Sequence, residues 1–188
     1  MLTVNDFKFQ EGRMGTLSAL VGWNKEEKQI DIHATANDGP DAMTYINGYV
    51  SPVRSDIWLD IRAAGSSIEF CKSFTESFLS DIRGKAYGLL TLSGPLGEMN
   101  LTGDIIANGQ GTVTVLNTTY TLDNDTVHFV PNDIQFRRCP IKDRLQRVAW
   151  VTGGIHHDHL SDMTFDIDIE AEDFLAYDFP AFGDDINS

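Results

Sequence analysis

Basic side chains and long apolar runs are both scarce in this sequence of 188 residues. Lysine and arginine together number 14 against 28 aspartate and glutamate residues, which gives a net charge of −14. Nucleic acids and anionic membrane surfaces attract clustered basic residues, so this charge argues against both as partners. No apolar run approaches the roughly 18 residues of a membrane-spanning helix. The composition therefore indicates a soluble segment with a modest core.

Cysteine and the usual catalytic motifs are scarce as well. The two cysteines, Cys71 and Cys139, form neither a CxxC motif nor a metal-type pair. Free thiols are favoured over a disulfide between them, and their spacing leaves both open. The sequence contains no Gly-x-Ser-x-Gly motif and no phosphate-binding glycine loop. We therefore expect no enzyme, no catalytic residue and no cofactor.

The two ends of the chain favour an internal piece of a longer protein. Met1 is followed by Leu-Thr-Val-Asn-Asp, without the basic start and apolar run of a signal peptide. Residues 182–188 have no pattern of a closing strand. Either the protein is cytosolic, or this is a fragment of an exported one.

Alternation of apolar and polar residues is the dominant pattern that the sequence does contain. Residues 163–171 alternate strictly, and residues 56–63 and 29–34 repeat the pattern. Alternation places one residue type on each face of a strand, whereas a helix would spread the apolar residues around its surface. Further strands are expected at 15–23, 43–50, 85–93, 99–107, 111–116, 119–122, 126–130, 134–138 and 147–156. Short turns rich in Asn, Asp, Gly and Pro separate them, so we predict a mainly β, mostly antiparallel amphipathic sheet.

The segment 67–83 departs from this pattern. Cys71, Phe74, Phe78 and Ile82 recur at helical spacing. This spacing predicts a short amphipathic helix whose apolar side packs on the sheet. An exposed helix that binds lipid or a partner is the less favoured interpretation.

The predicted helix divides the chain into three parts. Residues 1–66 are expected to form the N-terminal amphipathic strands, 67–83 the helix, and 84–188 the central and C-terminal strands. We expect these parts to form one continuous domain.

Two kinds of residue cluster carry potential chemistry. Residues 156–159 read His-His-Asp-His, and such side chains can bind zinc. A polar hairpin loop is favoured, because neighbouring strand residues face opposite ways and no distant ligand is evident. The pairs Asp166 with Asp168 and Asp123 with Asp125 could serve glycoside hydrolysis or calcium binding. A solvated strand face and a turn explain them better.

Several stretches of the chain carry a family likeness. Residues 84–109 contain a G-x-x-x-G strand, an SG-x-L turn and an L-x-G-x-I strand. Residues 116–122, 127–129, 134–136 and 154–169 follow in the order found in Bacteroidetes-type members. This order resembles the C-terminal region of the TamB family of translocation and assembly module proteins.

The resemblance covers most of the chain, best from about residue 70 to 177. A departure lies at 143–148, where a glycine-rich turn would be expected. The resemblance implies a sheet curled into a β-taco, a trough with an apolar interior. It also implies a soluble periplasmic segment of a protein that is anchored in the inner membrane and meets an outer-membrane barrel partner of the TamA type. Members are implicated in phospholipid transport and outer-membrane protein assembly, and are not known for a catalytic site.

Three functions remain open at this stage. The favoured one is a trough that carries phospholipid acyl chains, with small residues such as Gly88, Gly103 and Ala107 leaving room for them. An assembly module would instead pair a partner strand with an open sheet edge, and open edges would also allow homo-oligomers. A closed β-sandwich that binds carbohydrate would use Trp58 and Trp23. The expected groove residues are Ile57, Leu59, Ile61, Leu90, Leu92, Leu101, Ile105, Val113, Val115, Phe165, Ile167 and Ile169.

Overall fold

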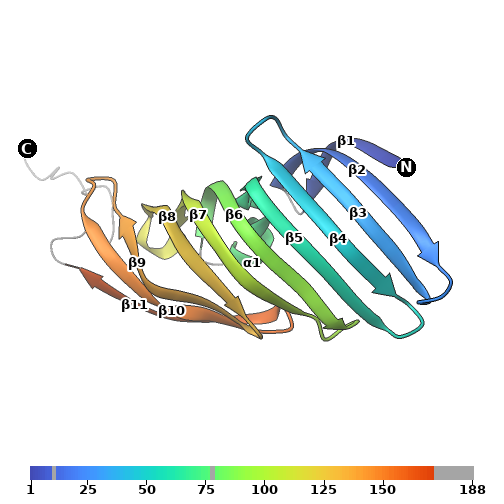
Figure 1. Ribbon diagram of the computed structural model, residues 1–188. Helices are drawn as coiled ribbons and strands as arrows, with labels where there is room; N and C mark the ends of the chain where they lie inside the picture. Colours follow the sequence, from blue (N-terminus) through green and yellow to red (C-terminus); the bar gives the residue numbers. More distant parts are fainter. Residues whose placement is uncertain (10–11, 77–78, 172–188) are drawn as a thin grey trace, which may run out of the picture.

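The computed structural model describes residues 1–9, 12–76 and 79–171, and its strands form a single sheet (Figure 1). The strands are β1 (Leu2–Phe9), β2 (Gly12–Asn24), β3 (Gln29–Asn37), β4 (Met43–Ser51), β5 (Asp56–Ser67), β6 (Leu79–Pro95), β7 (Asn100–Val113), β8 (Thr118–Val130), β9 (Asp133–Lys142), β10 (Val148–Asp158) and β11 (Ser161–Ala171). Each strand pairs with the next in sequence order, so the 11 strands form one meander with antiparallel pairing. The prediction of a mainly β, open sheet is confirmed. The alternative of a closed sandwich is wrong, because the described strands belong to one sheet with two free edges.

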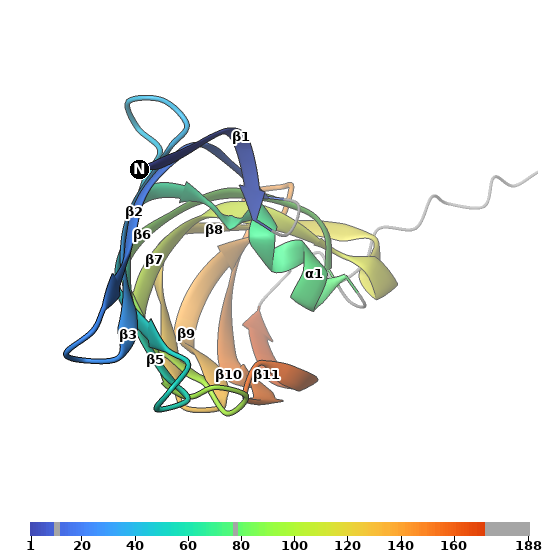
Figure 2. The same ribbon diagram turned by 90° about the vertical axis from the view of Figure 1, so that its right-hand side faces the viewer.

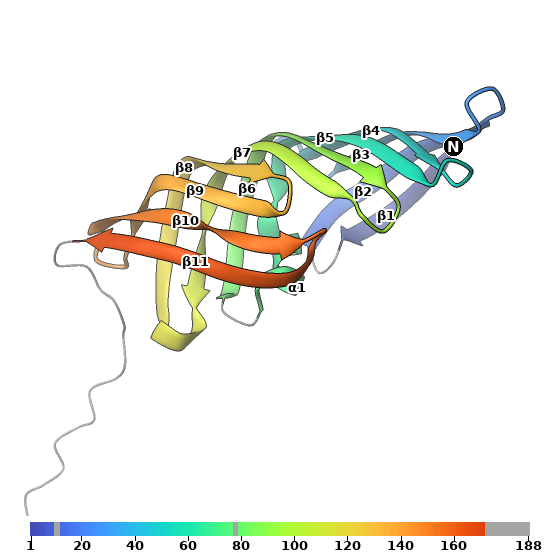
Figure 3. The ribbon, with the colours of Figure 1, turned by 90° about the horizontal axis from the view of Figure 1, so that it is seen from below.

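The sheet is strongly curved. Figure 2 shows the strands bending around a hollow, with α1 (Lys72–Thr75) on the hollow side. Figure 3, from below, shows β11 along the outer edge of the curved sheet. The hollow side is called the concave face and the other side the convex face.

The pairing of residues between neighbouring strands shows that the apolar residues share one of these faces. Leu59 lies opposite Leu92, and Leu92 lies opposite Leu101 on the next strand. Ile68, in the 3-10 turn before α1, packs on the same row at the centre of the sheet. Because this turn lies in the hollow, the apolar face of the sheet is its concave face.

Glycines in the strand interiors make this curvature sterically feasible. Gly88 and Gly103 have φ values of 145° and 130°, which side chains rarely adopt. A Cβ at Gly88 would lie 2.3 Å from the carbonyl oxygen of Asp104, on the neighbouring strand. These glycines therefore let the strands bend and approach closely. Their small size serves the backbone, and the expectation that they leave room for a ligand stays a prediction.

The predicted helix over 67–83 is not formed as expected. The helical part consists of a 3-10 turn, Ile68–Cys71, and a single α-turn, Lys72–Thr75, and the chain is a strand from Leu79. A register shift between Ser80 and Arg83 explains the misleading spacing. It brings Leu79 and Ile82 to the same face, where both approach Gly111, so a bulged strand imitates helical periodicity.

Several strands are longer than predicted. Turns were expected at 108–109 and at 123–125, but both segments lie inside continuous strands, β7 and β8. Register shifts accommodate these turn-type residues within the strands. Asn124, for example, has a φ of 53°, in the left-handed region. The strand β1 was not predicted. Its alternation is interrupted by Asp6, which has φ 52° and lies at a register shift.

Candidate functional site: the concave apolar face

The most extensive feature of the molecule is the apolar concave face. Cross-strand register carries the same row of apolar positions from one end of the sheet to the other. Its members include Leu17, Ala19 and Val21 of β2, Ile30, Ile32 and Ala34 of β3, Ile46 and Val50 of β4, Ile57, Leu59 and Ile61 of β5, Ala86, Leu90 and Leu92 of β6, Leu101, Ile105 and Ala107 of β7, Tyr120, Val127 and Phe129 of β8, Ile134, Phe136 and Cys139 of β9, Ala149, Val151 and Ile155 of β10, and Phe165, Ile167 and Ile169 of β11.

The centre of this face is closed by its own side chains. Ala86, Leu90 and Ile105 form a buried cluster, with Ile68 and Phe129 packed against it. Strand curvature brings these side chains together, and the 3-10 turn covers them. The centre is therefore a small hydrophobic core in its own right.

The two ends of the face are not covered by described residues. Val21 and Trp23 on β2 are each 52% exposed. On β11, Phe165, Ile167 and Ile169 are 40%, 39% and 47% exposed. Large apolar side chains are thus presented to solvent in rows at both ends of a continuous concave surface, which is a recognised mark of a binding surface.

The structure brings most of the expected groove residues together. Those of β5, β6 and β7 form adjacent rows, and those of β11 extend the same face at its far end. Val113 lies at the end of β7 on the concave face, opposite Thr118. The side chain of Val115 lies outside the described residues. Their contact with lipid stays a prediction.

Sequence reasoning missed many members of this face. Tyr120, Val127, Phe136 and Val151 line it, but none was singled out. In each strand, the alternation of apolar and polar residues was the signal that could have identified them. Register shifts between 107 and 109 in the β7–β8 pair, and between 151 and 153 in the β9–β10 pair, hide which alternating set faces inward.

The convex face is mixed in character. It carries exposed apolar residues such as Leu89 and Ile106 beside polar ones such as Asp60, which accepts a hydrogen bond from Thr91 at 2.8 Å. Trp58 lies on this face, whereas Trp23 lies on the concave face. The two tryptophans considered for carbohydrate binding are therefore on opposite sides of the sheet.

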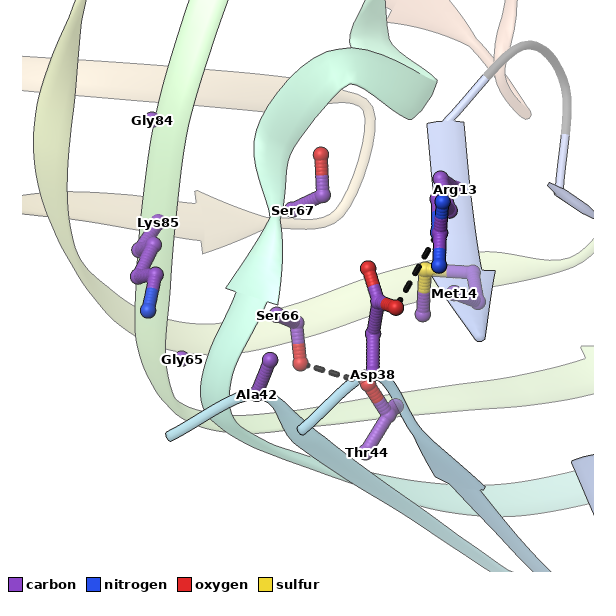
Figure 4. Close-up of a pocket in the computed structure, with 10 residues that line it drawn as sticks. All are labelled: Arg13, Met14, Asp38, Ala42, Thr44, Gly65, Ser66, Ser67, Gly84 and Lys85. Carbon is purple, nitrogen blue, oxygen red and sulfur yellow. Dashed lines mark hydrogen bonds and ion pairs between the residues drawn. The ribbon is translucent and has the colours of Figure 1, made fainter. Parts of the chain in front are cut away.

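A small polar cavity of about 220 Å³ lies where β2, β4, β5 and β6 approach the β3–β4 turn (Figure 4). The Arg13 Nε donates to Asp38 at 3.0 Å, and the hydroxyls of Thr44 and Ser66 share a hydrogen bond of 2.6 Å. Lys85 donates to a backbone carbonyl of the β3–β4 turn. These groups satisfy one another, so the cavity serves as a polar end to the apolar face.

The histidine cluster ties three hairpin turns together at one end of the sheet. The Leu160 backbone N–H donates to His157 Nδ1 at 3.1 Å, and the His159 N–H donates to Asn132 Oδ1 at 2.9 Å. The His159 Nδ1 lies 3.2 Å from the carbonyl of Met99, in the β6–β7 turn. Burial lowers the pKa of His157, with smaller opposing effects from nearby carboxylates. The cluster is therefore a structural link between turns.

The remaining candidates for chemistry have structural surroundings too. Cys139 is a buried free thiol, and burial, followed by the charge of Asp125, raises its pKa to about 11. The side chain of Cys71 lies outside the described residues. Asp166 and Asp168 lie on the convex face of β11. In the described part of the chain, no cluster of three or more His, Cys, Asp or Glu could hold a metal ion.

Across residues 1–9, 12–76 and 79–171, no helix has the length and apolar character needed to cross a membrane. Comparisons with protein-family models, with characterised proteins and with solved structures find no match for this chain.

Proposed function

We propose that the concave face binds phospholipid acyl chains and that this chain is a trough segment of a TamB-like protein. The observation that carries the proposal is the apolar face itself, which continues from strand to strand across the sheet, is covered at its centre and is exposed at both ends. Extended hydrocarbon is the ligand class that matches a long surface of aliphatic side chains with few polar groups.

The energetics of hydrocarbon burial support this ligand class. Each methylene removed from water contributes about 0.8 kcal/mol. An acyl chain of some ten methylenes lying on the exposed rows would thus gain several kcal/mol without any directed polar contact. Such binding tolerates different lipids, since it depends on area and shape.

The same surface is poorly explained as an ordinary core. In a sandwich a second sheet would cover it, but the described chain offers only the 3-10 turn and α1 for that purpose. The exposed side chains of Ile167 and Ile169 on β11 would be an aggregation hazard in water unless they have an occupant. Acyl chains would remove that hazard.

The cellular setting of the proposal comes from the family resemblance. It comprises a periplasmic location, an inner-membrane anchor in the full-length protein, and an outer-membrane barrel partner of the TamA type. Phospholipid transport and support of outer-membrane biogenesis are the roles that this setting would give the trough.

Lipid extraction followed by mass spectrometry tests the proposal. The chain, purified from bacteria in mild conditions, is expected to carry co-purified phospholipid. Replacing Ile169 with Asp on the concave face should reduce the lipid recovered per protein, because it places a charge where acyl chains would lie.

A matched control is available on the other face. Ile106 is 44% exposed on the convex face, close to the 47% of Ile169, so Ile106→Asp makes a similar change away from the trough. The control should keep its lipid. Absence of lipid from the unmodified chain, or an equal loss in both variants, would overturn the proposal.

A further inference from the structure

The two edges of the sheet differ in how well they are protected against pairing. β1 is short, and its register with β2 shifts twice, between Val4 and Phe7 and between Phe7 and Lys8. Bulges and an edge lysine are devices that discourage a further strand. β11 carries no lysine, and its register with β10 shifts only near its start, between Ser161 and Thr164, and then runs without a shift from Thr164 to Ala171. Among the described residues no strand pairs with the outer edge of β11, so its regular part offers backbone donors and acceptors as a template.

The side chains of β11 form two rows of different chemistry. Phe165, Ile167 and Ile169 lie on the concave side and are partly exposed. Asp166 and Asp168 lie on the convex side, and neither side chain has a hydrogen bond or ion pair within the described residues. A strand added beside β11 would place its own side chains next to both rows.

An internal interaction indicates what the acidic row accepts. Glu170, the third carboxylate of the row, lies 3.7 Å from Arg138 of β9. The Arg138 guanidinium lies over the Trp150 ring, 4.8 Å from its centroid, and so reaches across β10 to β11. A basic side chain that reaches β11 from the β10 side therefore already pairs with this acidic row. At the opposite, outer edge of β11, Asp166 and Asp168 offer two more carboxylates for the same kind of ion pair.

We propose that the edge of β11 binds an extended segment of another polypeptide in which apolar residues alternate with lysine or arginine. The segment adds a twelfth, antiparallel strand by backbone hydrogen bonds. Its apolar residues continue the concave row beside Ile167, and its basic residues lie next to Asp166 and Asp168. This interaction is independent of what occupies the concave face.

The same chemistry disfavours a second copy of this chain as the partner. Antiparallel pairing of two β11 strands would bring carboxylates of the two copies close together, and like charges on facing strands are destabilising. The bulged register of β1 gives it a poor match for a regular edge. A basic, alternating strand avoids both conflicts.

Labelled nine-residue peptides test the proposal by fluorescence anisotropy on the full chain. One peptide alternates Val or Ile with Lys, a second has Glu in place of Lys, and a third has the composition of the first in shuffled order. The first is expected to bind at least about tenfold more tightly than the others, since several opposite-charge pairs and the alternation both favour it. Added salt should weaken its binding.

Variants of the chain separate strand pairing from general attraction to an acidic protein. The double variant Asp166→Lys with Asp168→Lys should reverse the preference between the Lys and Glu peptides. The control, Glu26→Lys with Glu27→Lys in the distant β2–β3 turn, changes the net charge equally and should keep the original preference. Methylation of alternate peptide amides should abolish binding, because it removes edge hydrogen-bond donors.

Several results would overturn the proposal. These are equal binding of the ordered and shuffled peptides, retained binding after amide methylation, and the same preference in both double variants. Dimerisation of the chain that is abolished by Ile167→Pro, or tighter binding of a peptide with the sequence of residues 172–188, would assign the edge to a different occupant. Absence of binding by every peptide would also overturn it.

Discussion

The centre of the sheet and its last hairpin have the same alternating sequence pattern but bury it to very different extents. Leu90 in β6 is 7% exposed, whereas Ile169 in β11 is 47% exposed, although both lie on the concave face. Leu90 has neighbouring strands on both sides and belongs to the cluster that the 3-10 turn covers. Ile169 has a strand on one side only among the described residues. Alternation therefore fixes the face of a residue, while its burial depends on strand curvature and on position within the sheet.

Charge placed at the two positions should give the largest contrast. Leu90→Asp buries a carboxylate in the central cluster and should cost more than about 4 kcal/mol of unfolding free energy. Ile169→Asp should cost less than about 1 kcal/mol, since its side chain already meets solvent. Urea denaturation of both variants measures the difference. Similar losses would show that the centre and the edge form one equally packed core.

Bending of the central strands can be tested through Gly88. Gly88→Val should lower the unfolding free energy by more than about 2 kcal/mol, because its positive φ and the nearby backbone of β7 leave no room for a side chain. A Cβ added at Gly22 would meet no other atom within 4 Å, so Gly22→Val serves as the control and should change stability little. Thermal unfolding monitored by circular dichroism compares them, and equal effects would contradict the bending role.

The β9–β10 turn gives a test outside the central cluster. The carboxylate of Asp143 is buried and accepts hydrogen bonds from the backbone N–H groups of Leu145 and Arg147 and from the Arg147 Nε at 2.9 Å. Asp143→Ala should cost about 1–3 kcal/mol, because it leaves these donors without their acceptor. Hydrogen exchange should increase in this turn while the β6–β7 ladder stays protected. Uniform loss of protection would mean that turn and centre unfold together.

Acidification should produce the smallest effect, through His157. Burial lowers the pKa of its imidazole, so the folded chain binds the proton less readily than the unfolded chain. This penalty is absent well above the ordinary pKa of about 6.5 and grows as the pH falls below it, until the folded-state pKa is passed. Asp133, Asp158 and His159 surround the group and modulate the effect.

Urea unfolding at about pH 8 and about pH 5 measures this contribution, with a change of about 1 kcal/mol or less. His157→Gln should remove part of the pH dependence. His33→Gln, on the exposed convex face of β3, should leave it unchanged. An unaltered pH dependence in His157→Gln would assign the effect to other groups.

Strand faces could be predicted from the sequence because alternation survives in most of the chain. Residues 56–63 and 163–171 lie in strands with the expected set on the concave face. The secondary-structure predictions were wrong where a β-bulge interrupts the two-residue alternation of a strand. At Leu79 and Ile82 a bulge imitated a helix, and at Asn124 it imitated a turn. Such irregularities depend on contacts with the neighbouring strand, which a single sequence does not display.

Which parts of the concave face are exposed could not be predicted from the sequence for a related reason. The pattern of Ile167 resembles that of Ile61, yet one lies at an edge and the other is packed against the central cluster. The two cases differ in the number of neighbouring strands and in the packing at the centre of the sheet, neither of which the alternating pattern displays. The candidate groove could therefore be predicted as a set of residues, but not its covered and uncovered parts.

The strictly sequential strand order has a consequence for how such a molecule can change in length. Each described strand pairs only with its immediate neighbours in the chain, so the architecture of this part is nearly one-dimensional, as in repeat proteins. Duplication or deletion of one hairpin would lengthen or shorten the curved sheet without changing the partners of any other strand. The width of the sheet can thus change by one hairpin at a time.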